Sequence, residues 1–350
     1  MKILHCADLH LDTPFTGRTP EQTVFLQQQL LRIPGMLSEL CRREGCDLWL
    51  LSGDVFDGPW TKESFLALKE ALKDAGVPVF IAPGNHDYVN QNSPYLSEIW
   101  PENVHIFTQP RMETILLEEL DCRVYGAGYR SMDCGSLLEG FQAREDARYH
   151  VGILHGDPTQ ANSPCCPVTA EQIRSSGLDY LALGHIHKQG FLQQGRTLCA
   201  WPGSPMGRGF DETGVKGVLL VTLEESRAEF IPLDTPRFFE QTCDAAALDR
   251  LLPAVGNAHF YRITLTGQNP EPSLETLYRQ YDRFPNLELR DRRTAPMDLW
   301  SSIDADTLEG AYFRILREKM KDADDQTQEI VELAARISRQ LLDGQEVVLP

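Results

Sequence analysis

The stretch Val77–Asp87, VPVFIAPGNHD, joins a short apolar run to a polar cluster. Val77–Ala82 suits a strand that is buried on both faces, as in a parallel sheet. The cluster Gly84-Asn85-His86-Asp87 follows at once, and Gly84 permits a sharp turn there. A polar turn alone would not need an amide, an imidazole and a carboxylate in succession. The stretch therefore predicts a buried strand whose carboxyl end carries functional side chains.

Similar apolar runs recur through the first two thirds of the chain. They are Ile3–Ala7, Leu48–Ser52, Val151–Leu154, Tyr180–Leu183 and Val218–Leu223. Helical patterns lie between some of them, at Phe25–Arg43 and Lys62–Ala75, and Gly76 is a typical helix end. This alternation of strands and helices predicts an α/β layered fold.

Polar clusters also follow four more of these strands. They are Asp8-x-His10, Gly53-Asp54, His155-Gly156-Asp157 and Gly184-His185-x-His187. Ligands of α/β sheets bind beyond the carboxyl ends of the strands, so all these clusters are expected to meet at one site. Five of the nine histidines of the chain lie in them, which packing alone does not easily explain.

Each short cluster is a weak signal when it is taken alone. Asp8 and His10 would point the same way on an extended chain and could share one ion, as could His185 and His187. The alternatives are a capping aspartate with a surface histidine, and an Asp54 that caps the next helix. Together the clusters favour a metal centre, because the two carboxylate oxygens of Asp54 can bridge two cations. Nitrogen and oxygen ligands without thiolates suit Mn, with Fe or Zn as alternatives.

The overall charge bears on the substrate. The chain has 350 residues, with 33 Lys+Arg against 51 Asp+Glu and a formal net charge of −18. An acidic protein does not attract nucleic acid as a whole, so a DNA substrate would need a local positive field. Two divalent cations beside Asp8 and Asp54 would leave the site positive by about two charges.

The cysteines and the hydropathy indicate a soluble cytoplasmic protein without membrane association. Nine cysteines without a C-x-x-C spacing are typical of a reduced intracellular set. The first residues, MKILHCADLHLD, lack the apolar core of a signal peptide. No apolar run approaches the roughly 20 residues that a bilayer crossing requires.

The pattern changes after about Asp234, which predicts three parts: 1–235, 236–298 and 299–350. The second is expected to be a small α/β cap, with strands Phe238–Cys243, Phe260–Leu265 and Leu287–Arg290 and helices Ala245–Leu252 and Leu274–Tyr281. The third is expected to be helical at Leu308–Met320 and Thr327–Leu342. The last helix has an apolar stripe of Ile330, Leu333, Ala334, Ile337 and Leu341. Such a stripe packs on its own domain or docks to a partner.

The ordered motifs D-x-H, G-D-x-x-D, G-N-H-D, H-G-D and G-H-x-H, across roughly residues 1–235, resemble the calcineurin-like metallophosphoesterase superfamily. The blocks ADLHLDTPF, GDVFD and PGNHDY are similar to the SbcD-type DNA-repair exonucleases. The segment WPGSPMGRGFDETGVKG, Trp201–Gly217, is similar to the YhaO-like branch. We therefore expect a four-layer α/β/β/α sandwich with two mixed sheets, followed by the small α/β cap and C-terminal helices.

The resemblance also implies roles for the site residues. One metal would be held by Asp8, His10 and His187, and the other by Asn85, His155 and His185. Asp54 would bridge the two metals. His86 would stay off the metals and act on the substrate, with Asp87 orienting it. Arg208, in Gly207-Arg208-Gly209, could contact the substrate backbone or form a loop salt bridge.

The resulting hypothesis is a metallophosphoesterase of the exonuclease type that hydrolyses DNA with two divalent metals, Mn first. The resemblance implies a partner, an ABC-type ATPase of the SbcC kind that binds C-terminal helices, and a homodimer is left open. One alternative is a phosphoesterase for nucleotides or other small phosphodiesters, which would need a closed pocket instead of a positive open groove. The other is a non-enzymatic adaptor with a structural metal site, against which the His86–Asp87 pair argues.

Overall fold

The computed structural model describes residues 1–350 except 295–296, 322, 345–346 and 348–350. The chain divides into two compact units. The first comprises Met1–Glu240 with Ala258–Arg262, and the second Gln241–Asn257 with Ile263–Pro350. The predicted cap at 236–298, which includes the undescribed residues 295–296, and the predicted helical segment at 299–350 stay predictions as domains.

One six-stranded sheet of the first unit has the strand order β12-β11-β1-β2-β3-β4. Its strands are β1 (Lys2–Cys6), β2 (Leu48–Leu51), β3 (Val79–Ile81), β4 (Val104–Ile106), β11 (Gly217–Thr222) and β12 (Arg227–Pro232). Strands β1 to β4 are parallel, whereas β11 runs antiparallel to both β1 and β12. The carboxyl ends of β1, β2 and β3 therefore lie at one edge of this sheet.

The other six-stranded sheet has the order β5-β6-β7-β8-β10-β9. Its strands are β5 (Glu113–Leu117), β6 (Cys122–Gly126), β7 (Tyr149–His155), β8 (Tyr180–Gly184), β9 (Gly190–Gln194) and β10 (Thr197–Trp201). Strands β6, β7, β8 and β10 are parallel, and the edge strands β5 and β9 are antiparallel to their neighbours. Both sheets are thus mixed, as predicted.

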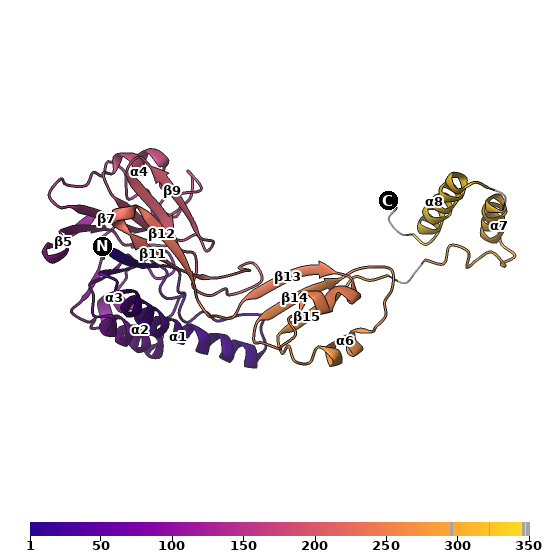
Figure 1. The fold of residues 1–350 in the computed structure, drawn as a ribbon, viewed down its shortest axis with the longest axis horizontal. Coiled ribbons are helices and arrows are strands. Elements are labelled where there is room, and N and C mark those ends of the chain that lie inside the picture. Colours follow the sequence, from indigo (N-terminus) through magenta and orange to yellow (C-terminus); the bar gives the residue numbers. More distant parts are fainter. Residues whose placement is uncertain (295–296, 322, 345–346, 348–350) are drawn as a thin grey trace. The chain divides into compact units, whose positions relative to one another are not determined.

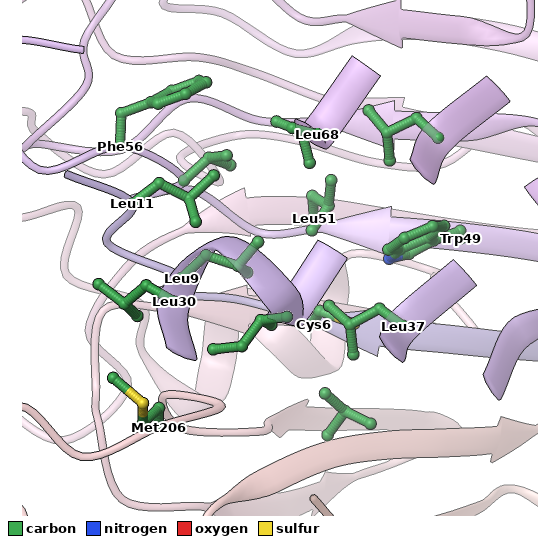
Figure 2. Packing of buried hydrophobic residues seen from close by; sticks show 14 of the residues in the cluster. Cys6, Leu9, Leu11, Leu30, Leu37, Trp49, Leu51, Phe56, Leu68 and Met206 are labelled. Carbon is green, nitrogen blue, oxygen red and sulfur yellow. The ribbon is translucent and has the colours of Figure 1, made fainter. Parts of the chain in front are cut away.

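Alternating side chains of these strands form separate apolar cores. Leu48 and Leu50 of β2 share one core with Val151 and Ile153 of β7, which places the two sheets face to face. Trp49 of β2, on the other face, packs in a second core with apolar residues of the helices. Figure 2 shows part of that core, including Cys6, Leu37 and Trp49.

A third core covers the outer face of the second sheet. It joins Leu181 and Leu183 of β8 to Ile173 of α4 (Ala170–Ser175), a helix that the sequence patterns did not indicate. Helices α1 (Pro20–Glu44) and α2 (Lys62–Ala75) lie on the opposite side of the strands from α4 (Figure 1). The three cores separate four layers, so the predicted α/β/β/α sandwich is confirmed.

Local capping explains where the long helix begins and ends. Thr19 and Gln22 form a capping box, in which each side chain binds the other residue's backbone N–H. Gly45 ends the helix in the left-handed region, at φ 63°. The predicted start at Phe25 was therefore too late, because apolar spacing alone does not register the cap. The remaining short helices of this unit are α3 (Pro94–Ser97) and the 3₁₀ turns η1 (Glu118–Leu120) and η2 (Leu223–Glu225).

The predicted elements beyond Asp234 are present. Strands β13 (Phe238–Cys243), β14 (Phe260–Leu265) and β15 (Leu287–Asp291) form one sheet in that order. The helices are η3 (Ala245–Ala247), α5 (Leu248–Leu251), α6 (Leu274–Gln280), α7 (Leu308–Met320) and α8 (Asp325–Leu342). In α8 the buried apolar residues are Val331 and Ala335, whereas Ile330 and Leu341 of the predicted stripe are exposed. Leu333, Ala334 and Ile337 of the stripe are half-buried, so the stripe is partly covered within its own unit and partly exposed.

None of the helices in the described part of the chain combines the length and apolar character that crossing a membrane requires.

Candidate metal centre

The polar clusters at the strand ends of both sheets meet in the first unit. The His155 ring, at the end of β7, donates its Nδ1–H to the carbonyl oxygen of Ser52 after β2, at 2.9 Å. The backbone N–H of His185, after β8, donates to the Asp8 carboxylate after β1, at 3.0 Å. These bonds join the carboxyl end of one sheet to that of the other. The predicted convergence of the clusters is therefore present in the structure.

Ligand atoms gather in three overlapping groups that could hold metal ions. The groups are Asp8, His10 and His187; Asp8, Asp54 and His155; and His10, Asp54 and His86, each with its ligand atoms within 4.8 Å of one another. Asp54 belongs to two groups, which suits the predicted bridge. His86 belongs to one, although the family resemblance keeps it off the metals.

Asn85 brings the remaining two histidines together. Its side-chain oxygen lies 2.9 Å from His155 Nε2 and 3.3 Å from His185 Nδ1. His155 Nε2 is also 3.3 Å from Asp54 Oδ2. This is the grouping that the family resemblance implies for a second metal, with Asp54 beside it.

The donor arrangement fits cations better than it fits a closed hydrogen-bond network. His10 Nε2 and His187 Nε2 face each other at 3.1 Å, and His10 Nδ1 is buried without a hydrogen-bond partner among the described residues. In addition, the His155 Nδ1–H bond to Ser52 leaves Nε2 as the nitrogen that faces the site. Imidazole and carboxylate donors of this kind suit Mn, Fe or Zn.

The backbone is strained where several of these side chains project. Asp8, His10, Asp54 and His185 have φ values of 52°, 48°, 49° and 91°. Such values are uncommon for residues other than glycine, and they gather at functional sites because the surrounding structure holds them. The expectation that Asp8 and His10 lie on an extended strand was therefore wrong: β1 ends at Cys6, and left-handed turns bring the two side chains together.

Close packing explains the glycine of the G-N-H-D cluster. A Cβ added to Gly84 would lie 2.3 Å from Asp54 Oδ1 and 2.8 Å from His155 Cγ. Real Cβ atoms do not approach other atoms so closely. Gly84 is thus needed for the loop after β3 to pass against the proposed bridging carboxylate.

Opposite charges hold the buried centre together. Burial raises the pKa of the Asp54 carboxyl, but the nearby His155, His10 and His86 outweigh burial and bring the pKa below its usual value. Burial lowers the pKa of His155, whereas Asp54 and Asp8 raise it, with a net rise to about 9. Metal ligands must be unprotonated, so a cation at this centre would compete with the proton of His155.

The structure assigns the orientation of His86 to a residue other than the predicted one. His86 Nδ1 donates to Asp57 Oδ1 at 2.8 Å. This hydrogen bond raises the pKa of His86, although burial of the ring acts in the opposite direction. Asp87, in contrast, is buried and accepts hydrogen bonds from the backbone of Gly84, Val55 and Phe56 and from the Tyr95 hydroxyl. The prediction that Asp87 orients His86 was therefore wrong, because Asp87 is used to pin the loops after β2 and β3.

The other side of the centre has a similar pair. His187 Nδ1 lies 2.8 Å from Glu212 Oε1 and 3.0 Å from Arg208 Nη2. The Arg208 guanidinium binds both Glu212, at 2.8 Å, and Asp57, at 3.4 Å. Of the two interpretations of Arg208, the loop salt bridge is thus the contact that is present.

Asp57 and Glu212 are the site residues that sequence reasoning did not assign. Asp57 closes the G-D-x-x-D motif, so its position was a usable signal. Glu212 lies within the quoted segment Trp201–Gly217, but no spacing links it to His187. Only the folded chain brings Glu212 and His187 together.

Comparisons with known proteins identify the family of the chain and several relatives. Residues 1–189 match the family model described as calcineurin-like phosphoesterase. The chain is 35% identical over 237 residues to the uncharacterized metallophosphoesterase YhaO of Bacillus subtilis (strain 168), covering 63% of this chain and 57% of that protein. It is 25% identical over 266 residues to a subunit of the nuclease SbcCD of the same organism, covering 63% and 66%.

A further relative is the DNA double-strand break repair protein Mre11 of Aeropyrum pernix. The identity is 24% over 220 residues, covering 58% of this chain and 53% of that protein. The chain therefore matches between about half and two thirds of the length of these curated relatives.

Proposed function

The chain belongs to the calcineurin-like phosphoesterase family, and we propose that it is an exonuclease that hydrolyses DNA phosphodiesters with two divalent metal ions. The observation that carries the proposal is the meeting of seven donor residues that follow strands of both sheets. They are Asp8, His10, Asp54, Asn85, His155, His185 and His187.

In this proposal each metal has its own ligands. Asp8, His10 and His187 would hold one, Asn85, His155 and His185 would hold the other, and Asp54 would serve both. We propose Mn as the metal, with Fe or Zn as alternatives, because the donors are nitrogen and oxygen without thiolate. When bound, the two cations would polarise the phosphate and lower the pKa of a water that serves as the nucleophile.

Two histidine–carboxylate pairs of the protein would then orient the reacting groups. The Asp57 carboxylate fixes the ring of His86 through Nδ1, so that Nε2 can hold a proton for the phosphate or for the leaving oxygen. The contact of Glu212 with His187 Nδ1 directs Nε2 of that ring toward Asp8 and His10. Each histidine thereby receives a fixed orientation before substrate binds.

Support for DNA comes from the relatives named for a nuclease and for double-strand break repair. A cavity of about 830 Å³ beside His187 also includes Lys188, Arg208 and Lys216 among its lining residues. These cations could offset the net charge of −18 locally. Asp211 and Glu212 line the same cavity and reduce the field that it offers.

A partner ATPase is part of the proposal, because one relative is named as a subunit of the SbcCD nuclease. The second unit has large exposed apolar side chains on α7 and α8, among them Ile315 and Ile330. Such side chains are suited to contact with another protein.

The decisive experiment measures Mn-dependent release of nucleotides from linear double-stranded and single-stranded DNA, beside bis-p-nitrophenyl phosphate. Wild type is compared with His86→Ala, and bound Mn is quantified in both. Loss of a positioned acid should lower kcat by about 10²–10⁴-fold while metal content stays the same. DNA degradation that the substitution abolishes would support the nuclease.

Other outcomes favour the alternatives. The acidic charge favours a phosphoesterase for small phosphodiesters, which would cleave the chromogenic diester and leave DNA intact even after the ATPase partner is added. An adaptor would cleave neither substrate, and His86→Ala would leave its partner binding unchanged.

A further inference from the structure

A second cavity, of about 730 Å³, lies on the His86 side of the centre. Its lining includes His86, the aromatic residues Trp60 and Tyr88, and the amide residues Asn90, Gln91 and Asn92. Lysine, arginine and glutamate are missing among the described residues that line it. Its only carboxylate among those residues, Asp87, is buried and already accepts four hydrogen bonds. In contrast to the cavity beside His187, this one is lined by aromatic and neutral polar residues.

The two residues of this aromatic wall, Trp60 and Tyr88, are held in place: Tyr88 packs against the third core, and Trp60 is bonded to the loop that follows Tyr88. Trp60 Nε1 donates to the carbonyl oxygen of Asn92 at 2.8 Å, and its ring lies 5.9 Å from that of Phe65. Within the loop, Asn90 Oδ1 accepts from the backbone N–H of Asn92, and Asn90 Nδ2 donates to the Tyr88 carbonyl. The side chain of Asn90 is thus used to shape the loop.

The side chains of Gln91 and Asn92, in contrast, do not take part in shaping the loop. Gln91 and Asn92 are exposed, and neither side-chain amide has a hydrogen-bond partner among the described residues. Each amide offers both a donor and an acceptor to a ligand. The cavity therefore combines a fixed aromatic wall with free neutral hydrogen-bonding groups beside the proposed proton donor.

We infer that this cavity receives one nucleobase, carried by the nucleoside that is esterified to the phosphate at the metal centre. A base has a π face for stacking on aromatic rings and an uncharged edge for carboxamides. The volume lies in the range that binds a ligand of nucleoside size. The inference rests on the proposed function and adds to it a substrate class, in which the base next to the scissile phosphate is unpaired.

The test uses the full chain loaded with Mn and calorimetric titration with three probes. They are thymidine 5′-monophosphate, thymidine 3′-monophosphate and 2-deoxyribose 5-phosphate, the last of which lacks the base. Stacking of one base corresponds to about 5–150-fold in affinity. At least one thymidine monophosphate should bind more tightly than the sugar phosphate by a factor in that range.

The variants remove one ring at a time. Tyr88→Leu and Trp60→Leu should each reduce the affinity ratio of nucleotide to sugar phosphate at least threefold. Tyr88→Phe, which keeps the ring face, should retain the wild-type ratio. Thermal unfolding midpoints within a few degrees of wild type show that the variants fold. A ratio near one in wild type, or one that neither leucine substitution changes, would overturn the inference.

Turnover separates this inference from the proposed function. Thymidine 5′-(p-nitrophenyl phosphate) and methyl p-nitrophenyl phosphate have the same leaving group and differ in the nucleoside. If both are hydrolysed and no ring-dependent affinity ratio exists, the phosphoesterase proposal stands and the base site fails. If neither is hydrolysed while nucleotide binding depends on the rings, the base site stands and the proposed hydrolysis fails.

Discussion

A histidine paired with a carboxylate stands on each side of the candidate metal centre. His86 Nδ1 contacts Asp57 and His187 Nδ1 contacts Glu212, both at 2.8 Å. The pairs differ in the surroundings of the other ring nitrogen, Nε2. His187 Nε2 lies 3.1 Å from His10 Nε2 and 3.9 Å from Asp8, whereas the His86 ring is 41% exposed and lines an open cavity.

The comparison leads to the hypothesis that the same two-residue pair serves two purposes, according to its surroundings. Where Nε2 points among other ligand atoms, the carboxylate orients a metal ligand. Where the ring is largely exposed and lines a cavity, as at His86, the carboxylate could orient a proton donor. Arg208 binds both carboxylates and thereby connects the two sides. This difference of purpose can be tested one residue at a time.

The largest effect is expected at Asp54, which belongs to two of the three groups of ligand atoms. Asp54→Asn keeps the shape of the side chain but removes the charge that would lie between the two metals. Metal-based stabilisation of several kcal/mol corresponds to on the order of 10⁴-fold in turnover, so hydrolysis should fall by about that factor. Metal content measured by atomic emission should fall with it.

A matched control lies at the opposite end of β2. Asp47→Asn also exchanges a carboxylate for an amide, at a residue that accepts a hydrogen bond from the backbone of Lys2. It should leave both metal content and turnover near wild type. Full metal loading of Asp54→Asn would contradict the bridging role.

The second prediction concerns the His86 side. Asp57→Asn should lower kcat by about 10–100-fold, less than His86→Ala, because the ring is retained but held less firmly. The metal dissociation constant should change less than threefold. Metal titration and steady-state kinetics on the same preparation check this. A loss of metal affinity with unchanged kcat would remove the distinction between the two sides.

Much of this site could be predicted from the sequence because its residues follow buried strands. Apolar runs such as Leu48–Ser52 are local signals, and the polar side chains at their carboxyl ends meet wherever parallel strands align. The parallel pairing of β1, β2 and β3 makes the clusters after them neighbours. Hence the residues that gather at the candidate centre could be named from the sequence without any knowledge of their contacts.

The rest depends on contacts that spacing does not encode. Glu212 meets His187 through a loop, so no period links them along the chain. Asp57 and Asp87 are both aspartates near His86, and only the burial of Asp87 against the backbone of Val55 and Phe56 decides between them. The left-handed turns at Asp8 and His10 were also missed, because a strand period assumes an extended backbone.

The third prediction concerns the His187 side. Glu212→Gln keeps a group that can accept a hydrogen bond but removes the charge beside Nδ1. The loss of such an orienting carboxylate typically costs about 10–100-fold in metal affinity. Turnover should therefore fall at limiting Mn and recover at saturating Mn. Failure to recover at saturation would indicate that Glu212 acts on the substrate step and not on the metal.

The smallest effect is expected at Arg208, which connects the two sides. Each carboxylate keeps another partner without it: Thr13 for Asp57, and Ser204 for Glu212. Partly exposed ion pairs contribute up to about 1 kcal/mol, so Arg208→Gln should lower kcat and metal affinity by about fivefold or less.

If Arg208 instead contacts the DNA backbone, KM should rise more than kcat falls. The slope of log affinity against log salt would then also decrease by about one. Lys188→Gln, in the same cavity but without these carboxylate contacts, is the control that separates a general loss of positive charge from a loss of the connection between Asp57 and Glu212.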